Sequence, residues 1–225
     1  MENNRPSISQ YLVTTCLLVI DELNERYKGM SKEELKKIAN EKFNEMDITV
    51  RLGNPFGHMA HYSVGDNGKS KNKNNHDIFI EQKDFIIEVK FLKNWKSGSK
   101  NNTSSNSKSW SEYQKDFDWL ISEIDAGNKD NRAFVIGWFN CVEYFSQLMQ
   151  LGTNPGVKTL LNEERVVYFP FLYKMKIPTY TTDLAYNYSW AYNPIPMNLI
   201  GNHIEKYNCM FLGNQKDCFH FAIYY

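Results

Sequence analysis

Apolar residues recur every three or four positions in the first part of the chain, and this spacing predicts two helices. The first begins at one of two serines near residue 8, either of which can cap it, and runs to about Lys28 before Gly29 ends it. The second opens with Ser31 followed by Glu34, the pattern of a capping box, and runs to about Glu45.

Shorter apolar runs without that spacing predict strands in the middle of the chain. We expect strands at residues 48–52, 77–81, 85–92 and 132–139, with a helix at about 109–126 before the last of them. Residues 132–139 are apolar almost throughout, as in a strand that is covered on both faces.

Beyond residue 140 the pattern is weaker. We expect a helix at 142–151, strands at 165–173 and 217–225, and an irregular aromatic loop at 180–196. Residues 65–75 and 93–108 are rich in Asn, Ser and Lys, which is typical of polar loops.

The charge of the whole chain is balanced, with 26 basic and 26 acidic residues, so there is no global attraction to nucleic acid or to a membrane. Charge is nevertheless uneven along the chain. Residues 68–108 hold nine lysines and four acids, an excess of five positive charges that favours a local polyanion partner. The alternative is that these lysines only keep two loops solvated.

The chain shows neither a signal-peptide pattern nor an apolar run near the length that spans a bilayer. Its four cysteines are far apart and form no CxxC pair, which disfavours zinc and fits reduced thiols. We therefore expect a cytoplasmic protein without membrane contact.

The candidate chemistry lies in the two strands at 77–81 and 85–92. A tight turn between them would bring Asp77 beside Glu88, and Lys90 shares the face of Glu88 because side chains alternate along a strand. Charges inside so apolar a strand are costly unless they are paired or bound to a metal. Two carboxylates and an amine at a sheet edge predict a site for metal-dependent hydrolysis.

At these residues the chain resembles the PD-(D/E)XK nuclease superfamily. Asp77 matches the first acid of the motif and Glu88-Val89-Lys90 match its acid-X-Lys, while His76 stands where proline is usual. The resemblance covers about residues 7–140 and implies the restriction-endonuclease-like αβββαβ core, an α/β fold in which helices flank a mixed central sheet.

The resemblance also implies a function. We expect residues 1–140 to form the nuclease core with its N-terminal helices, and residues 141–225 to be an extension for dimerisation or substrate recognition. The expected activity is Mg²⁺-dependent hydrolysis of DNA, with Mn²⁺ as a substitute, by a homodimeric restriction or anti-phage endonuclease. Asp77, Glu88 and the Val89 carbonyl would hold the metal. Lys90 would orient or deprotonate the metal-bound water, or stabilise developing charge, and we favour the orienting role.

Members of this superfamily often add a glutamate from the first core helix, and Glu22 is the preferred match, with Glu41 or Glu45 as alternatives. Gln114 or Lys115, at the start of the helix after the third strand, matches a position that contacts the scissile phosphate. Three histidines are weaker candidates for a ligand or proton shuttle: His58, His61 and His76.

Three alternatives stay open. The same core can carry a ribonuclease or toxin, because the metal chemistry does not distinguish the sugars. It can also be a non-catalytic module that binds nucleic acid or protein, or the hairpin can be a chance pattern in an unrelated α/β protein. The aromatic residues of 180–192 either stack on bases or, as we prefer, close a core.

Overall fold

A computed structural model of the chain describes residues 8–65, 75–93, 105–149, 161–175, 184–197 and 207–225. The helices are α1 (Ile8–Tyr27), α2 (Lys32–Glu41), α3 (Glu45–Gly53), α4 (Ser105–Asp125), α5 (Glu143–Met149) and α6 (Glu163–Val166). The strands are β1 (Ala60–Gly65), β2 (Asn75–Ile80), β3 (Phe85–Phe91), β4 (Arg132–Phe139), β5 (Leu172–Lys174), β6 (Leu184–Tyr186), β7 (Pro194–Pro196), β8 (Asn208–Leu212) and β9 (Phe219–Tyr224). Four short 3₁₀ helices complete the description: η1 (Asn54–Met59), η2 (Glu81–Lys83), η3 (Lys129–Asn131) and η4 (Tyr188–Trp190).

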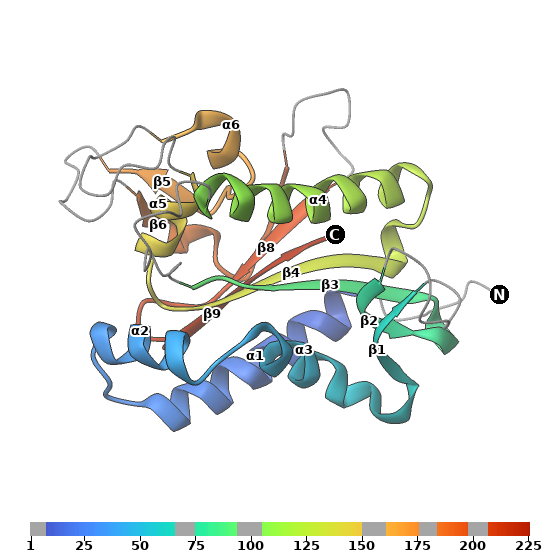
Figure 1. Cartoon of the computed structure of the whole chain (residues 1–225), viewed down its shortest axis with the longest axis horizontal. Coiled ribbons are helices and arrows are strands. Elements are labelled where there is room, and N and C mark those ends of the chain that lie inside the picture. The colour runs from blue at the N-terminus through green and yellow to red at the C-terminus, as the bar shows by residue number, and fades with distance from the viewer. Residues whose placement is uncertain (1–7, 66–74, 94–104, 150–160, 176–183, 198–206) are drawn as a thin grey trace.

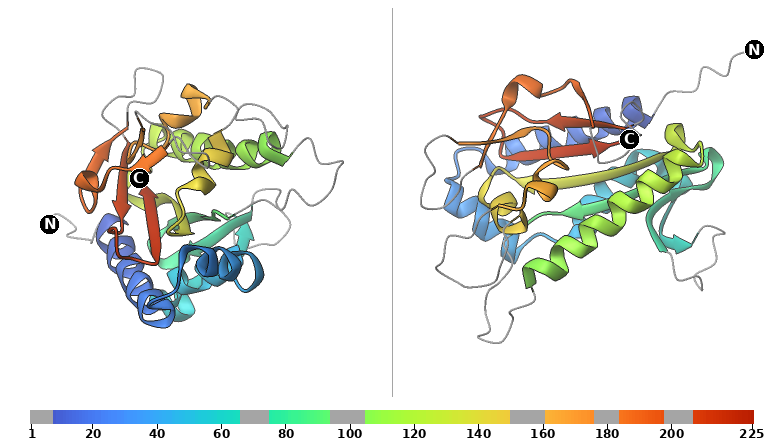
Figure 2. Two further views of the ribbon diagram at one scale, coloured as in Figure 1. Left: turned by 90° about the vertical axis from the view of Figure 1, so that its left-hand side faces the viewer. Right: turned by 90° about the horizontal axis from the view of Figure 1, so that it is seen from above.

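Seven strands form one mixed sheet in the order β1-β2-β3-β4-β9-β8-β7. β3 and β4 are parallel, and every other neighbouring pair in this sheet is antiparallel. The three N-terminal helices cover one face, and α4 and α5 lie on the other (Figures 1 and 2). The expected α/β class, with a mixed sheet between helices, is confirmed.

The apolar strand β4 separates two hydrophobic cores. Val135 packs into the core under the N-terminal helices, while Phe134 and Ile136 pack into the core under α4. All eight β4 residues are buried, as expected from their uninterrupted apolar run. A strand of this kind fixes both helical layers relative to the sheet, and therefore fixes the elements that carry the site.

The C-terminal third of the chain continues the same sheet. β9 pairs with β4 from Phe134↔Tyr224 to Phe139↔Phe219, and β8 and β7 follow outward from β9. The strand expected near the C-terminus is therefore confirmed. A role of this region in dimerisation or recognition stays a prediction.

The expected strand at 48–52 is wrong, because these residues lie in α3. Asn44 caps this helix and forms a capping box with Asp47, so the second helix ends at Glu41 instead of continuing to about Glu45. Ile48 and Leu52, four residues apart, are fully buried, which is helical spacing. The β-branched residues of this run have a strand preference that packing overrides.

The first strand of the sheet is instead β1, at residues 60–65, where the sequence carries a polar-apolar mixture. The strand expected at 165–173 is also wrong for most of its length. Asn162 caps the short helix α6, and only residues 172–174 extend as β5. The expected loop at 180–196 includes two three-residue strands, β6 and β7, within its described part.

Each helix in the described ranges is either too short or too polar to cross a membrane. The four cysteines are free thiols, and three of them are buried.

Candidate functional site

The site begins where β2 separates from β3. The two strands form the expected antiparallel hairpin through η2, and Asp84, in the left-handed conformation (φ 47°), leads into β3. Backbone pairing between them covers only Ile78–Ile80, whereas β2 continues to pair with β1 as far as Asn75. On this side the second half of β3 therefore has no backbone pairing to β2, and we call this unpaired stretch the gap.

Two carboxylates satisfy the backbone N–H groups of β3 along this gap. Asp77 Oδ2 accepts a hydrogen bond of 2.8 Å from the N–H of Val89, and Glu45 Oε2 accepts one of 3.3 Å from the N–H of Phe91. Buried N–H groups need partners, and here side chains from β2 and from the start of α3 replace the missing strand. The same arrangement holds both carboxylates beside β3.

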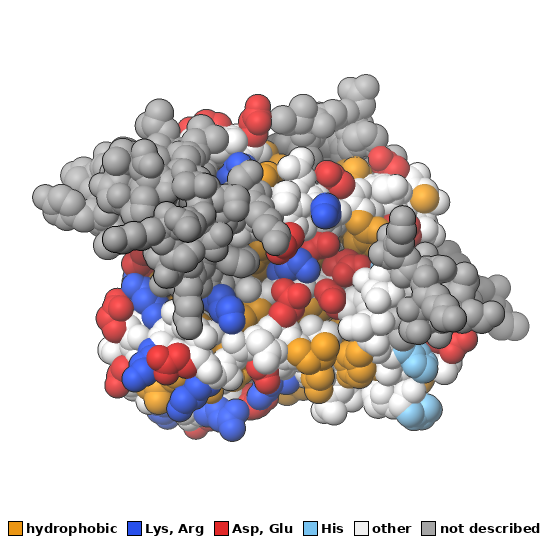
Figure 3. Space-filling view, in the orientation of Figure 1, with side chains coloured by type: hydrophobic (Ala, Val, Ile, Leu, Met, Phe, Trp, Pro, Cys, Tyr) orange, Lys and Arg blue, Asp and Glu red, His pale blue; other side chains and the backbone are white. Residues whose placement is uncertain are grey.

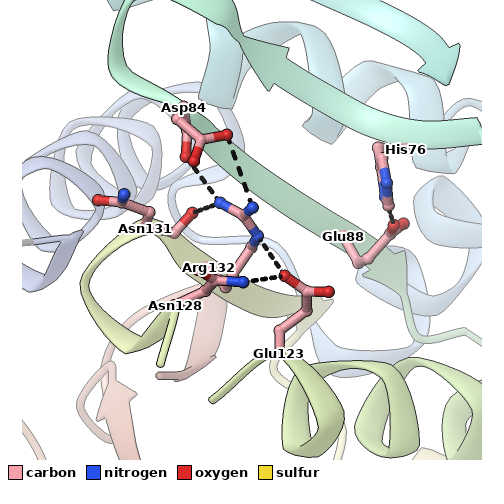
Figure 4. A network of polar contacts seen from close by, with 7 residues as sticks. All are labelled: His76, Asp84, Glu88, Glu123, Asn128, Asn131 and Arg132. Atoms are coloured by element: carbon pink, nitrogen blue, oxygen red, sulfur yellow. Dashed lines mark hydrogen bonds and ion pairs between the residues drawn. The ribbon is translucent and has the colours of Figure 1, made fainter. Parts of the chain in front are cut away.

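Glu88 lies on the face of β3 toward α4, since Ile87 and Val89 pack into the opposite core. Its Oε1 is 2.5 Å from Nδ1 of His76, and both side chains are almost completely buried. Figure 4 shows this pair beside β2 and β3. The imidazole also packs against Trp119 of α4, with ring centroids 5.5 Å apart. His76 is therefore part of the support for Glu88.

Lys90 extends from the same face of β3 and contacts groups from three elements. Its Nζ lies 3.1 Å from Oδ2 of Asp116 on α4, 3.8 Å from Oε1 of Glu45 on α3, and 3.3 Å from the carbonyl oxygen of Val89. Figure 3 shows acidic and basic side chains gathered in the middle of this face of the molecule, below α4. Lys90 is thus a cation among several acids.

The four carboxylates near Lys90 share one electrostatic property. Burial raises the pKa of each of them, and for Asp116 it raises the pKa to about 6. Lys90 opposes this shift in every case but does not cancel it. The four are Glu45, Asp77, Glu88 and Asp116. The group therefore lies in a desolvated environment that disfavours the charged forms of these acids, and His76 joins Lys90 in opposing that effect at Glu88.

Lys90 itself stays a cation. Burial disfavours its charged form, but the carboxylates of Asp116, Glu45 and Asp77 outweigh that effect and raise the pKa of Lys90 above its ordinary value. An ammonium of this kind donates hydrogen bonds and stabilises negative charge, and it does not accept a proton at neutral pH. The expected role of Lys90 in orienting water stays a prediction.

Within the part of the chain that the structure describes, no three His, Cys, Asp or Glu side chains form a group that could hold a metal ion. Asp77 and Glu45 are turned toward backbone N–H groups, and Glu88 is turned toward His76. Asp77 and Glu88, two of the acids expected to bind a metal, therefore lie close to each other without forming a complete coordination shell, and Glu22 does not join them.

Other predicted residues lie apart from this group. Glu22, on α1, pairs with Arg51 of α3 at 3.2 Å, whereas Glu45, one of the two alternatives, reaches Lys90. Glu41 is exposed at the end of α2. Gln114 is exposed on α4, as is Lys115.

The remaining sequence-based candidates divide in the same way. His58 and His61 are exposed, and His61 lies 4.0 Å from Glu81. Among the aromatic residues of the 180–192 run, Tyr186 packs against Trp138, whereas Trp190 is 42% exposed. Tyr180 and most lysines of the two polar loops lie outside the described residues.

Sequence reasoning missed Asp116. It is one residue away from Phe117, and three after Tyr113, in the buried stripe of α4, so its side chain lies at the border of the helix face that packs on the sheet. An acid at the border of an apolar stripe is a recognisable signal, and its helical spacing from Tyr113 could have identified it.

Comparisons of the chain with protein-family models, with curated proteins and with solved structures give no significant match.

Proposed function

We propose that this chain is a metal-dependent phosphodiesterase that cuts DNA, built on a restriction-endonuclease-like core. The observation that carries the proposal is the meeting of Asp77, Glu88 and Lys90 at the gap between β2 and β3, with Glu45 joining them from a helix. The order of helix, three strands, helix and parallel strand also agrees with the αβββαβ arrangement that the motif implies.

The donor atoms around the gap suit a hard divalent cation such as Mg²⁺, or Mn²⁺ in its place. They are oxygens, and burial raises the pKa of the acids that carry them, so a cation bound among these acids would favour their ionised forms. Asp77, Glu88 and the Val89 carbonyl would hold the metal, with Glu45 as the helix acid. When bound, the metal supplies charge stabilisation for the phosphate and a water of lowered pKa.

The side chains around the gap orient the reacting groups and hold the carboxylates in place. Lys90, held as a cation by its acidic neighbours, donates hydrogen bonds to the attacking water or to a phosphate oxygen. His76 holds the carboxylate of Glu88 in place, and the β3 backbone holds those of Asp77 and Glu45. Each reacting group is thereby fixed by packed strands and helices.

The expected biological setting is a restriction or anti-phage endonuclease. Cleavage of both strands of a duplex needs two active sites, and a homodimer supplies them by symmetry. The lysine-rich segments on either side of the hairpin in sequence are suited to phosphate contacts, which weaken as salt rises. A ribonuclease on the same core remains the first alternative.

The test is cleavage by the wild type and by Lys90→Met, with supercoiled plasmid, linear duplex, single-stranded DNA and structured RNA in Mg²⁺, Mn²⁺ or EDTA. Lys83→Met is the matched control, because Lys83 lies in the turn of the same hairpin and contacts Tyr11. Metal-dependent cleavage by the wild type and the control, lost in Lys90→Met, supports the proposal. Cleavage of RNA alone selects the ribonuclease.

A second candidate is a non-catalytic binding module with the same fold. It is favoured by the absence, among the described residues, of a completed group of metal ligands, and by the ion pairs that already engage Lys90. This candidate predicts no cleavage of any substrate by folded protein in either metal, together with nucleic-acid or protein binding that Lys90→Met leaves unchanged.

A further inference from the structure

The contacts of Lys90 fall into two kinds. The Val89 carbonyl oxygen, at 3.3 Å from Nζ, and the Glu45 carboxylate, at 3.8 Å, are both ligands in the metal site proposed above. Asp116, at 3.1 Å, is the nearest carboxylate to Nζ and is not among those metal ligands. The ammonium of Lys90 therefore shares oxygens with the proposed metal on one side and has a separate partner on the other.

Asp116 is well placed to hold Lys90 on its own. It comes from the middle of α4, whose Phe117 and Tyr113 are anchored in the core, and its side chain is 17% exposed, close to the 18% of Lys90. The charges of Glu88 from β3, Glu112 from α4 and Glu45 from α3 also act on Asp116. The contact is an ion pair in which Oδ2 of Asp116 makes no hydrogen bond to the described residues, and its Coulomb attraction is less screened than at the surface although burial disfavours both charges.

The hydroxyl of Tyr113 marks the same region as polar and incompletely satisfied. It is buried and has no hydrogen-bond partner among the described residues. The charges of Glu45 and Asp116 both act on it. The region between α4 and β3 therefore holds a buried polar group beside the acids that contact Lys90.

We infer that Asp116 is a positioning residue that retains the ammonium of Lys90 beside the site when a divalent cation takes over the Val89 carbonyl and the Glu45 carboxylate. This inference rests on the proposed function. Two cations that share the same oxygens repel each other, so Lys90 must give up these two contacts. Without Asp116, Lys90 would have only the metal ligands as partners, namely the Val89 carbonyl and the Glu45 carboxylate, and it would compete with the metal for them.

Competition between Lys90 and the metal is measurable without any substrate. Lys90→Met removes the competitor and is expected to tighten Mn²⁺ binding. Asp116→Asn returns the ammonium to the metal ligands and is expected to weaken Mn²⁺ binding by about tenfold. This is within the range of interaction energies measured between side chains in contact. In the double variant the competitor is absent, so Asp116→Asn is expected to lower the Mn²⁺ affinity by about twofold or less.

The experiment is calorimetric titration of Mn²⁺ into the wild type, the two single variants and the double variant, each checked for folding by circular dichroism. Glu112→Gln is the matched control, since Glu112 is an exposed acid on the same helix whose charge also reaches Asp116. It is expected to have the same small effect with and without Lys90. Asp116→Glu, which keeps the charge, is expected to restore most of the wild-type affinity.

If Asp116→Asn weakens Mn²⁺ binding equally with and without Lys90, the inference is overturned. A long-range charge effect of Asp116 adds to the effect of Lys90→Met, whereas positioning of Lys90 by Asp116 makes the two effects depend on each other. Lys90→Met alone gives a second check that does not depend on Asp116: unchanged or weaker Mn²⁺ binding would also overturn it. If the wild type binds no Mn²⁺, the metal dependence in the proposed function is contradicted. If it binds Mn²⁺ but the effects of the two substitutions on affinity are additive, only this inference is contradicted.

Discussion

The carboxylate of Asp77 accepts a 2.8 Å hydrogen bond from the backbone N–H of Val89, at the point where β2 leaves β3. Asp77 therefore has a structural task, satisfying a buried strand N–H, as well as its proposed chemical one. The two tasks use different properties of the side chain. The hydrogen bond needs an acceptor oxygen, whereas metal binding needs the negative charge.

Asp77→Asn and Asp77→Ala should separate these tasks. The amide oxygen of Asn can still accept from Val89, so we expect a free energy of unfolding within about 1 kcal/mol of the wild type, whereas Ala should cost about 1–3 kcal/mol. Both variants should lose metal-dependent cleavage. Urea denaturation and a plasmid assay measure the two effects, and equal destabilisation by Asn and Ala would show that the hydrogen bond is not the stabilising contact.

Glu45 and Glu22 provide a comparison between two helix acids. Glu45 contacts Lys90 and the N–H of Phe91, whereas Glu22 pairs with Arg51 in a partly exposed ion pair. We expect Glu45→Gln to lower cleavage by about 10²-fold, as for loss of one group that acts on a reacting centre. Glu22→Gln should leave cleavage unchanged and alter stability by less than about 1 kcal/mol. The reverse result would restore Glu22 as the helix acid.

The hairpin and its two acids could be predicted from the sequence because the evidence is local. Alternation along β3 and a three-residue turn are enough to place Asp77, Glu88 and Lys90 together. The strand expected at 48–52 failed for a different reason. Its β-branched residues favour a strand, and only the capping box of Asn44 and the burial of Ile48 and Leu52 reveal a helix.

Contacts between distant elements could not be predicted in this way. Glu45 is separated from Phe91 by 46 positions, and its role depends on where α3 begins. Asp116 meets Lys90 only because α4 crosses that face of the sheet. The crossing of a helix over a sheet is set by packing of both cores, which no short sequence pattern records.

Asp116 should give the stability of the metal-free protein a measurable pH dependence. Its pKa rises from 3.8 to about 6 on folding, so the folded state holds the proton more tightly, and this contribution to stability is lost as pH rises between those values. Relative to Asp116→Asn, the wild type should lose up to about 3 kcal/mol between about pH 4 and pH 7. Urea denaturation in EDTA across this range measures the difference, and parallel pH profiles would contradict the expected shift. Saturating Mg²⁺ should reduce the loss, because a cation favours ionised carboxylates.

Arg132 should control folding of the sheet without controlling the chemistry. Its guanidinium pairs with Glu123 of α4 at 2.8 Å and with Asp84 before β3 at 3.6 Å, and it donates to the carbonyl of Asp84 at 2.7 Å (Figure 4). The side chain is 8% exposed and ties the start of β4 to the turn of the hairpin and to the end of α4.

Arg132→Met should therefore lower the free energy of unfolding by about 3 kcal/mol. This is the lower end of the range for breaking a buried ion pair, since the Asp84 side chain is mostly exposed and that of Glu123 is partly exposed. Lys36→Met, which breaks the exposed pair with Glu33, should cost less than about 1 kcal/mol. Below the unfolding transition, both variants should cleave at the wild-type rate per folded molecule. A loss of cleavage by folded Arg132→Met would mean that the network also holds the acids around Lys90 in place.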